Sequence, residues 1–309
     1  MKKKRLSMKV HKYECGRKDK TMWLLPMRTM LRLYSGHMYP VINHHKWLKN
    51  QGHLVRWESV SPDETVIYVS HEWGRDDHAD PKGVQIGVLC RTLKMLMKGE
   101  MHTFTLKSKQ NTEAITSKEW VEKLQNRVYI WFDWFCVPSE LPGQALNYVP
   151  AYMERSNIML ILAPGYRRQK QQGISDQKMQ QMWTHLCYRT WRRNALCCFD
   201  FMCAYLHPLK SRLPTLLVKS SQEGGQEHIS VYNARKLKIG ECLFPCCKSN
   251  HKNSSSMHCL KSIAESLLRR MIRVRSSTEF ERESKQSYAM ARMLLVEAHW
   301  ILRGLSKDI

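Results

Sequence analysis

The chain has 309 residues, of which 43% are hydrophobic, and its 50 Lys and Arg against 27 Asp and Glu give a formal net charge of +23. This composition excludes a globally disordered chain, and the longest apolar run, "IMLILA", is too short to span a bilayer. The positive charge is scattered along the chain, which favours a nucleotide or an acidic protein as partner and leaves nucleic acid as a weaker alternative.

Cysteine usage indicates the compartment. The chain has 11 cysteines, an odd count, and its start, "MKKKRLSMKV", lacks the apolar core of a secretory signal. We therefore expect a reducing compartment, the cytoplasm, in which the thiols are free or bound to metal rather than joined in a disulfide framework.

The first half of the chain divides at about residue 60. Residues 1–60 are basic and irregular, and we expect them to form an N-terminal extension with short helices at "MWLLPMRTMLRLY" and "HHKWLKNQGH". An α/β domain is expected at 61–235, beginning with the buried strand "ETVIYVS". Apolar residues follow helical spacing from Val84, and the polar segment after this helix indicates an insertion with a short helix near Trp120.

Strands and helices alternate in the second half of this domain. The strand "VYIWFDWFCVP" is apolar on both faces, as inside a parallel sheet. A helix at "NYVPAYMERSN" leads to the strand "IMLILAPG", a mostly helical segment contains "YRTWRRNAL", and "PTLLVKS" and "HISVYNA" are further strands. This alternation predicts an α/β fold with a parallel sheet flanked by helices. We expect 236–309 to hold a Cys/His-rich segment and a C-terminal helical subdomain.

Polar and aromatic side chains stand where the first two predicted strands end. Ser70, His71 and Trp73 follow one strand, and Asp133 and Cys136 follow the other. Because ligands of open α/β sheets bind beyond the carboxyl ends of the strands, these residues could converge on one crevice. There Ser70 and His71 would bind phosphate or ribose, or only satisfy the turn, and Trp73 would stack on a base or cover the core. Asp133 needs a partner, and His71 or an arginine is the natural choice.

Other residues allow two interpretations each. Cys136 with His71 could be a nucleophile, but a buried thiol is the commoner explanation. Asp77, His78 and Asp80 resemble a metal-ligand set and equally suit a turn before a helix. Arg167 and Arg168 could contact phosphate or lie in a solvated loop.

The Cys/His-rich segment is a candidate zinc site. Close cysteine pairs followed by histidine are typical of structural zinc. A Cys3His set could be drawn from this segment, although its spacing matches no common zinc finger, and unliganded thiols are the alternative. The candidate ligands are Cys242, Cys246, Cys247, His251 and Cys259.

Several ordered motifs resemble a TIR-like domain. "VIYVSHEW", "YIWFDWFCVP", "YVPAYMERSNIMLILAPGY" and "YRTWRRNAL" occur in the order of that family, and "WFDWFCVPSE" is similar to an element of the related HET domains. "SHEWGRDDHADPKGVQ" resembles the signature of a large TIR-like family in microbial eukaryotes. The resemblance covers about 63–305. It implies a flavodoxin-like fold, signalling through self-association, and, in some members, cleavage of NAD between nicotinamide and ribose.

The resemblance also implies which residue is missing. Active members use a glutamate of the "WCxxE" helix to stabilise developing positive charge. Aligning that motif with "WRRNAL" places Trp191 on the tryptophan and Ala195 on the glutamate, and the nearest acid of this helix is Asp200. We therefore expect a non-catalytic signalling or scaffold module, with Ser70, His71, Trp73, Asp133 and Trp191 contacting a nucleotide. Packing in the core is the alternative for Trp191. The alternative is an NAD-cleaving hydrolase or cyclase with a displaced carboxylate, drawn from Glu72, Asp77, Asp80 and Glu154.

Overall fold

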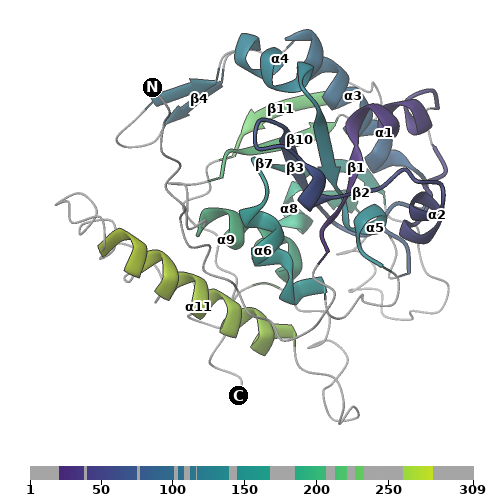
Figure 1. Cartoon of the computed structure of the whole chain (residues 1–309). Coiled ribbons are helices and arrows are strands. Elements are labelled where there is room, and N and C mark those ends of the chain that lie inside the picture. Colours follow the sequence, from purple (N-terminus) through teal and green to yellow (C-terminus); the bar gives the residue numbers. More distant parts are fainter. Residues whose placement is uncertain are drawn as a thin grey trace.

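The structure is a computed structural model, and it describes residues 21–37, 40–74, 77–100, 104–107, 112–115, 117–138, 145–167, 185–206, 213–220, 227–232, 242 and 260–280. These residues form a mixed α/β fold around a seven-stranded, largely parallel sheet with the order β11-β10-β7-β3-β6-β1-β2 (Figure 1). The predicted α/β class with a parallel sheet and flanking helices is therefore confirmed.

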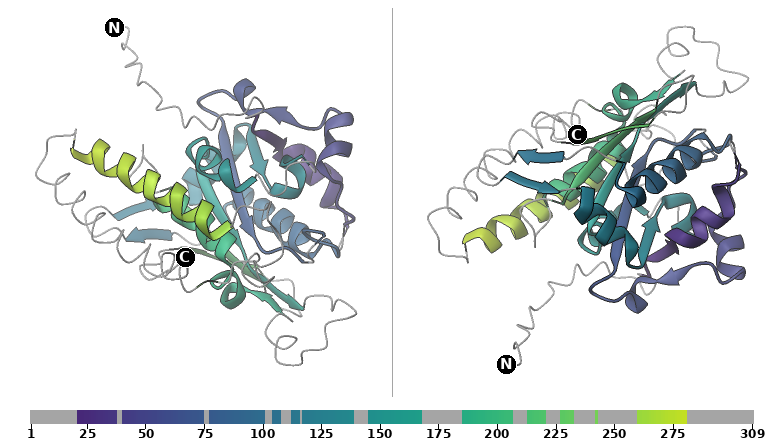
Figure 2. Two further views of the ribbon diagram at one scale, coloured as in Figure 1. Left: turned by 90° about the horizontal axis from the view of Figure 1, so that it is seen from below. Right: turned by 90° about the horizontal axis from the view of Figure 1, so that it is seen from above.

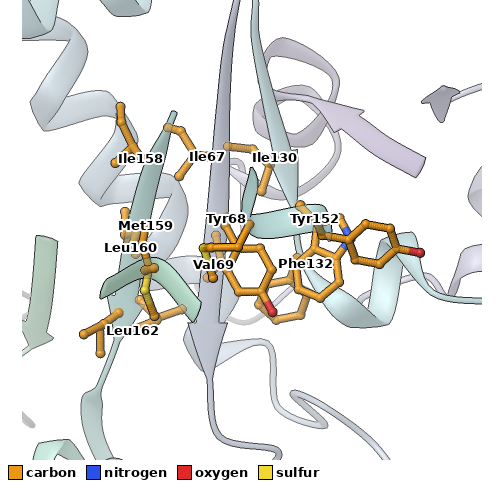
Figure 3. Packing of buried hydrophobic residues seen from close by; sticks show 14 of the residues in the cluster. Ile67, Tyr68, Val69, Ile130, Phe132, Tyr152, Ile158, Met159, Leu160 and Leu162 are labelled. Atoms are coloured by element: carbon orange, nitrogen blue, oxygen red, sulfur yellow. The ribbon is translucent and has the colours of Figure 1, made fainter. Parts of the chain in front are cut away.

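Four parallel strands form the centre of the sheet. They are β3 (Thr65–His71), β6 (Val128–Trp131), β7 (Ile158–Leu162) and β10 (Thr215–Ser220). β3 lies between β6 and β7, with Tyr68 opposite both Trp131 and Met159. Every residue of β3, β6 and β7 is buried, which explains their continuous apolar sequences. Figure 3 shows this core, in which Ile67, Ile130 and Ile158 lie side by side on neighbouring strands.

Helices cover both faces of the sheet. α3 (Val84–Lys98) packs with α1 (Met27–Tyr34) and α4 (Ser117–Gln125), and α6 (Val149–Glu154) packs with α9 (Ala195–Tyr205). The long helix α11 (Leu260–Phe280) contacts α9 and lies on the opposite side of the sheet from α3 (Figure 2). The predicted helices at Val84, at "NYVPAYMERSN" and at the start of the C-terminal subdomain are confirmed. The rest of the expected C-terminal helical subdomain, 281–309, lies outside the described residues.

The described part of the expected N-terminal extension contributes two strands to the central sheet. β1 (Trp23–Pro26) pairs antiparallel with β6 and with β2 (Val55–Arg56), so this segment extends the central sheet. α2 (His45–Asn50) and the short 3-10 helix η1 (Trp57–Ser59) complete it. Proline at the end of a four-residue strand hid β1 in the sequence, where the same stretch was expected to be helical.

Smaller elements also differ from the expectation. The second strand ends at Trp131, and the short helix α5 (Asp133–Cys136) follows it at once. α8 (Tyr188–Trp191) precedes α9, 3-10 helix η2 (Ala145–Asn147) precedes α6, and β11 (Glu227–Val231) pairs antiparallel with β10. Two hairpins were not expected: β4 (Phe104–Lys107) with β5 (Thr112–Ile115), and β8 (Pro164–Arg167) with β9 (His185–Cys187). Among the described residues no helix has the length and hydrophobicity needed to cross a membrane.

Candidate functional site at the carboxyl ends of the parallel strands

Asp133 is the centre of a polar cluster at the ends of β3 and β6. Its Oδ1 atom accepts a hydrogen bond from His71 Nε2 at 2.8 Å and from the backbone N–H of Trp134 at 2.6 Å. Its Oδ2 atom accepts one from Trp73 Nε1 at 2.6 Å. The sequence predicted that Asp133 needs a partner such as His71, and the structure confirms this pair and adds Trp73.

The surroundings of the His71–Asp133 pair favour the ionised form of both groups. Burial works against charge on both groups, but each is compensated by the other. Burial alone would lower the pKa of His71, and the charge and hydrogen bond of Asp133 raise that pKa above its usual value. Burial alone would raise the pKa of Asp133, and His71, Trp73 and the Trp134 N–H hold that pKa below its usual value. The His71 ring also stacks on Phe132, with ring centroids 4.0 Å apart.

Asp200 is a second carboxyl group in the same cluster. It projects from α9, where its Oδ1 atom accepts a hydrogen bond from the Tyr68 hydroxyl at 2.9 Å and its Oδ2 atom accepts one from Ser70 Oγ at 2.8 Å. Burial raises the pKa of Asp200 to about 7, with the charge of Asp133 adding to the rise and the two hydroxyl donors opposing it. The two carboxyl groups therefore differ in protonation near neutral pH, although both stand at one edge of the sheet.

Sequence reasoning noted Asp200 only as the nearest acid and did not place it in the site. The signal was present, because Asp200 is the single charged residue of α9, whose sequence is "ALCCFDFMCAY". A carboxyl group in an otherwise apolar helix needs a polar partner inside the fold. Its partners Tyr68 and Ser70 come from β3, and the spacing of sequence alone does not reveal that contact.

Burial separates the predicted ligand contacts into two groups. Trp73 and Asp133 are partly exposed, and the Asp133 side chain retains 27% of its accessible surface. Ser70 and His71 are buried, with 1% and 7% exposure, so they position the acids rather than offer a surface. For Trp191 the burial favours core packing over a ligand contact. Its exposure is 0%, and its Nε1 atom donates to Ser70 Oγ at 3.3 Å.

Trp134 was missed by sequence reasoning. It is partly exposed beside Trp73, with the two ring centroids 5.7 Å apart and the ring planes nearly perpendicular. The centroid of the His78 ring lies 4.2 Å from the centroid of the Trp134 ring. The aromatic surface therefore adjoins the carboxylate of Asp133. Aromatic faces next to a carboxylate suit a flat ring, above all one with positive charge.

The position aligned with the catalytic glutamate of TIR-like domains is buried. Ala195 begins α9 with an exposure of 0%. Asn194 caps the helix, and its Oδ1 atom accepts the backbone N–H of Leu196 at 3.0 Å and of Cys197 at 3.4 Å. A carboxylate introduced at this position would therefore begin from a buried backbone site.

The displaced carboxylates proposed from the sequence do not replace it. Glu72 has 5% exposure and accepts the Thr190 hydroxyl. Asp80 has 1% exposure, and its Oδ2 atom accepts the Ile86 N–H at 2.9 Å, which caps α3. Glu154 ends α6, four residues before β7 begins, and therefore lies at the amino ends of the strands. Asp77 is exposed in the turn after β3.

The loop between β3 and α3 is held by its own polar residues. Gln85 donates from Nε2 to the carbonyl oxygens of Glu72 at 2.8 Å and Ala79 at 3.0 Å. Burial raises the pKa of Asp80 to about 6, and the Ile86 N–H opposes the rise. These contacts explain much of the "DPKGVQ" motif as loop structure, which favours the turn interpretation of Asp80.

The metal and thiol predictions have different outcomes. No group of three or more metal-ligating side chains lies within the described part of the chain, which includes Asp77, His78 and Asp80. Of the candidate zinc ligands only Cys242 is described; Cys246, Cys247, His251 and Cys259 lie outside the described residues.

Cys136 is buried, and burial raises the pKa of its thiol to about 12, so the nucleophile interpretation is wrong. Arg168 and the side chain of Arg167 also lie outside the described residues.

Fold and cluster together define an α/β protein with a largely parallel sheet and two unlike carboxyl groups at its carboxyl edge. Comparison with protein-family models, with curated proteins and with solved structures finds no match in any of the three. The function therefore has to be argued from the site.

Proposed function

We propose that this chain is a TIR-like signalling module that binds a nucleotide, with NAD as the first candidate, and does not cleave it. The observation that carries the proposal is the ionised, partly exposed carboxylate of Asp133 beside the ring surface of Trp73 and Trp134. A carboxylate accepts hydrogen bonds from ribose hydroxyls, and tryptophan rings stack on a base. The faces of the two tryptophan rings also suit a positively charged nicotinamide ring through cation–π attraction.

Sheet topology supports a ligand at the same edge of the sheet. The parallel strands, numbered in chain order, have the spatial order 2-1-3-4, which matches the first four strands of the flavodoxin-like order. In such sheets the ligand lies where the strand order reverses, here between β3 and β7, which adjoins the Asp133 cluster at the ends of β3 and β6. The ordered motifs that resemble TIR-like and HET domains support the family. Self-association and an acidic protein partner are further parts of the proposal.

The charges of the cluster argue against cleavage. Stabilising a cationic transition state needs a carboxylate whose charge is not already neutralised. His71 compensates Asp133, and Asp200, with its pKa near 7, is largely neutral below that pH. Ala195 supplies no carboxylate.

Isothermal titration calorimetry with NAD tests binding. Trp73→Ala should weaken binding by about 5-fold to 100-fold, the range expected for loss of one stacking ring. Trp47→Ala is the matched control, because Trp47 is a partly exposed tryptophan of α2 outside the cluster. Equal affinity of the parent and the Trp73 variant would contradict the proposed site, as would absence of binding to the parent.

A second function, NAD cleavage, is favoured by Asp200. Above pH 7 its carboxylate would become ionised next to the Ser70 and Tyr68 hydroxyls. Nicotinamide release measured between pH 6 and pH 9 separates the two functions. We expect none. Release that rises through about pH 7 and disappears in Asp200→Asn would establish the enzyme instead.

A further inference from the structure

Two cysteines from distant parts of the chain lie in contact. Cys198 is the fourth residue of α9, and its Sγ atom is 3.1 Å from Sγ of Cys242. Both thiols also point at one carbonyl oxygen, that of Arg192, at 3.2 Å and 3.5 Å respectively. Cys198 is buried, whereas Cys242 is partly exposed.

We propose that Cys198 and Cys242 form a reversible disulfide bond when the chain meets a low-molecular-weight disulfide. The two sulfur atoms need to approach to only about 2.0 Å, a movement of about 1 Å. The inference depends on this contact alone and stands whether or not the proposed nucleotide site is correct.

The exchange takes place in two balanced steps. The thiolate of the more accessible Cys242 attacks the small disulfide RS–SR, and one RS⁻ leaves. The Cys198 thiolate then attacks the Cys242 sulfur, and the second RS⁻ leaves. Each leaving thiolate takes up one of the protons released by the two cysteines. The cysteine pair loses two electrons, and the small disulfide is reduced to two thiols.

Burial predicts how fast the second step runs. Burial and the neighbouring Cys242 raise the pKa of the Cys198 thiol well above its usual value. Cys198 is therefore protonated at neutral pH, so closure should be slow there and accelerate as the pH rises.

The bond would reach the candidate site through α9. Cys197, which precedes Cys198, donates from Sγ to the carbonyl oxygen of His71 at 3.4 Å. Asp200 lies two residues after Cys198. A disulfide at Cys198 would thus fix residue 242 to the helix turn that contacts His71. Residue 242 becomes covalently coupled to the helix that carries Asp200.

Peptide mapping of the full chain tests the proposal. The reduced protein is incubated with oxidised glutathione, alkylated, digested and examined by mass spectrometry. We expect a linked peptide pair with Cys198 and Cys242, and two fewer titratable thiols per unfolded chain than the 11 of the reduced protein. Dithiothreitol should reverse both changes.

Variants identify the partners. Cys198→Ser and Cys242→Ser should each abolish the linked peptide, whereas Cys203→Ser, a buried cysteine of the same helix, should retain it. Cys197→Ser should also retain it, which excludes the adjacent thiol. A link from Cys242 to any other cysteine would overturn the proposal, as would full alkylation of both thiols after oxidation. The proposal would also be overturned if the protein held zinc and removal of the zinc alone made these two thiols reactive to alkylation.

Discussion

At the scale of single residues, the His71–Asp133 pair links stability to pH. The folded-state pKa of Asp133 is lowered, so its contribution is present above about pH 4, its unfolded value, and is lost as pH falls through the lowered pKa. The pKa of His71 is raised, so its contribution is present below about pH 6.5 and is lost as pH rises through the raised pKa. The pair should therefore stabilise the fold most between about pH 4 and pH 6.5.

Asp133→Asn tests this window. Removing the charge leaves a buried imidazolium without its partner, and we expect a loss of about 1–3 kcal/mol near pH 5, less than for a fully buried pair. The reduction reflects the 27% exposure of the Asp133 side chain. Urea unfolding from about pH 3 to pH 9 measures it, with the exposed Asp63→Asn as control. A stability difference that stays constant across this range would show that the pair contributes no charge interaction.

Asp200 should show the opposite pH dependence. Because burial raises its folded-state pKa to about 7, the folded state holds a proton that the unfolded state has released. Stability therefore falls as pH rises from about 4 to 7, by up to about 1.4 kcal/mol per pH unit. Asp200→Asn should remove this slope, so the variant gains stability relative to the parent as the pH rises through this window. If the unfolding free energies of parent and variant changed in parallel with pH, the raised pKa would not belong to Asp200.

These residues also show what sequence can reveal about a site. The sequence predicted that Asp133 needs a partner, with His71 or an arginine as the natural choice, because a half-buried carboxylate must be compensated. It did not predict the contact of Asp200 with Tyr68, because a helix residue reaches a strand only through three-dimensional packing. For Trp191 it left both core packing and a ligand contact open, because a tryptophan looks the same in sequence whether it lines a site or fills a core.

At the scale of elements, α3 begins at a backbone contact that only glycine permits. Gly83 has a φ of 65°, and a Cβ atom there would lie 2.0 Å from the carbonyl oxygen of Pro40. Gly52 has a similar φ of 68° but open space around the same position. The two glycines therefore separate the effect of the backbone conformation from the effect of the contact.

Gly83→Ala and Gly52→Ala form a matched pair. Gly52→Ala should cost about 1–2 kcal/mol, the usual penalty for an L-residue at positive φ. Gly83→Ala should cost about 3 kcal/mol or more, since the Pro40 backbone must also move. Urea unfolding of both variants measures the difference. Equal losses would indicate that the contact between Pro40 and the start of α3 is absent in solution.

The ends of the strands were harder to predict from sequence patterns than the buried strands themselves. The buried strands β3 and β7 were predicted from their apolar runs, because a strand covered on both faces needs no polar residue. The end of β6 was not, since "WFDWFC" continues the apolar pattern while the backbone turns into α5. β1 was missed because its four residues carry no alternation and end in proline, and its place in the sheet depends on pairing with β6.

At the scale of the whole molecule, the N-terminal segment is part of the core. Six of its large side chains have exposures of 0–1%: Met22, Leu24, Leu25, Met27, Met30 and Tyr34. Burial of each contributes about 1.5–3 kcal/mol before the entropy cost of ordering the chain, so losing all six removes a large share of the hydrophobic stabilisation. Without β1 the edge of β6 would also be unpaired, and unpaired edges promote aggregation.

A chain that begins at residue 61 should therefore not fold cooperatively, although it retains the region that resembles a TIR-like domain. A chain that begins at residue 21 retains every described element and serves as the control. Urea unfolding followed by near-ultraviolet circular dichroism, with size-exclusion chromatography, distinguishes them. We expect one cooperative transition for the control, and aggregation or a non-cooperative change for the shorter chain. Cooperative unfolding of the shorter chain at the same midpoint would mean that β1 only covers an already stable sheet, and the domain boundary near residue 60 would then be correct.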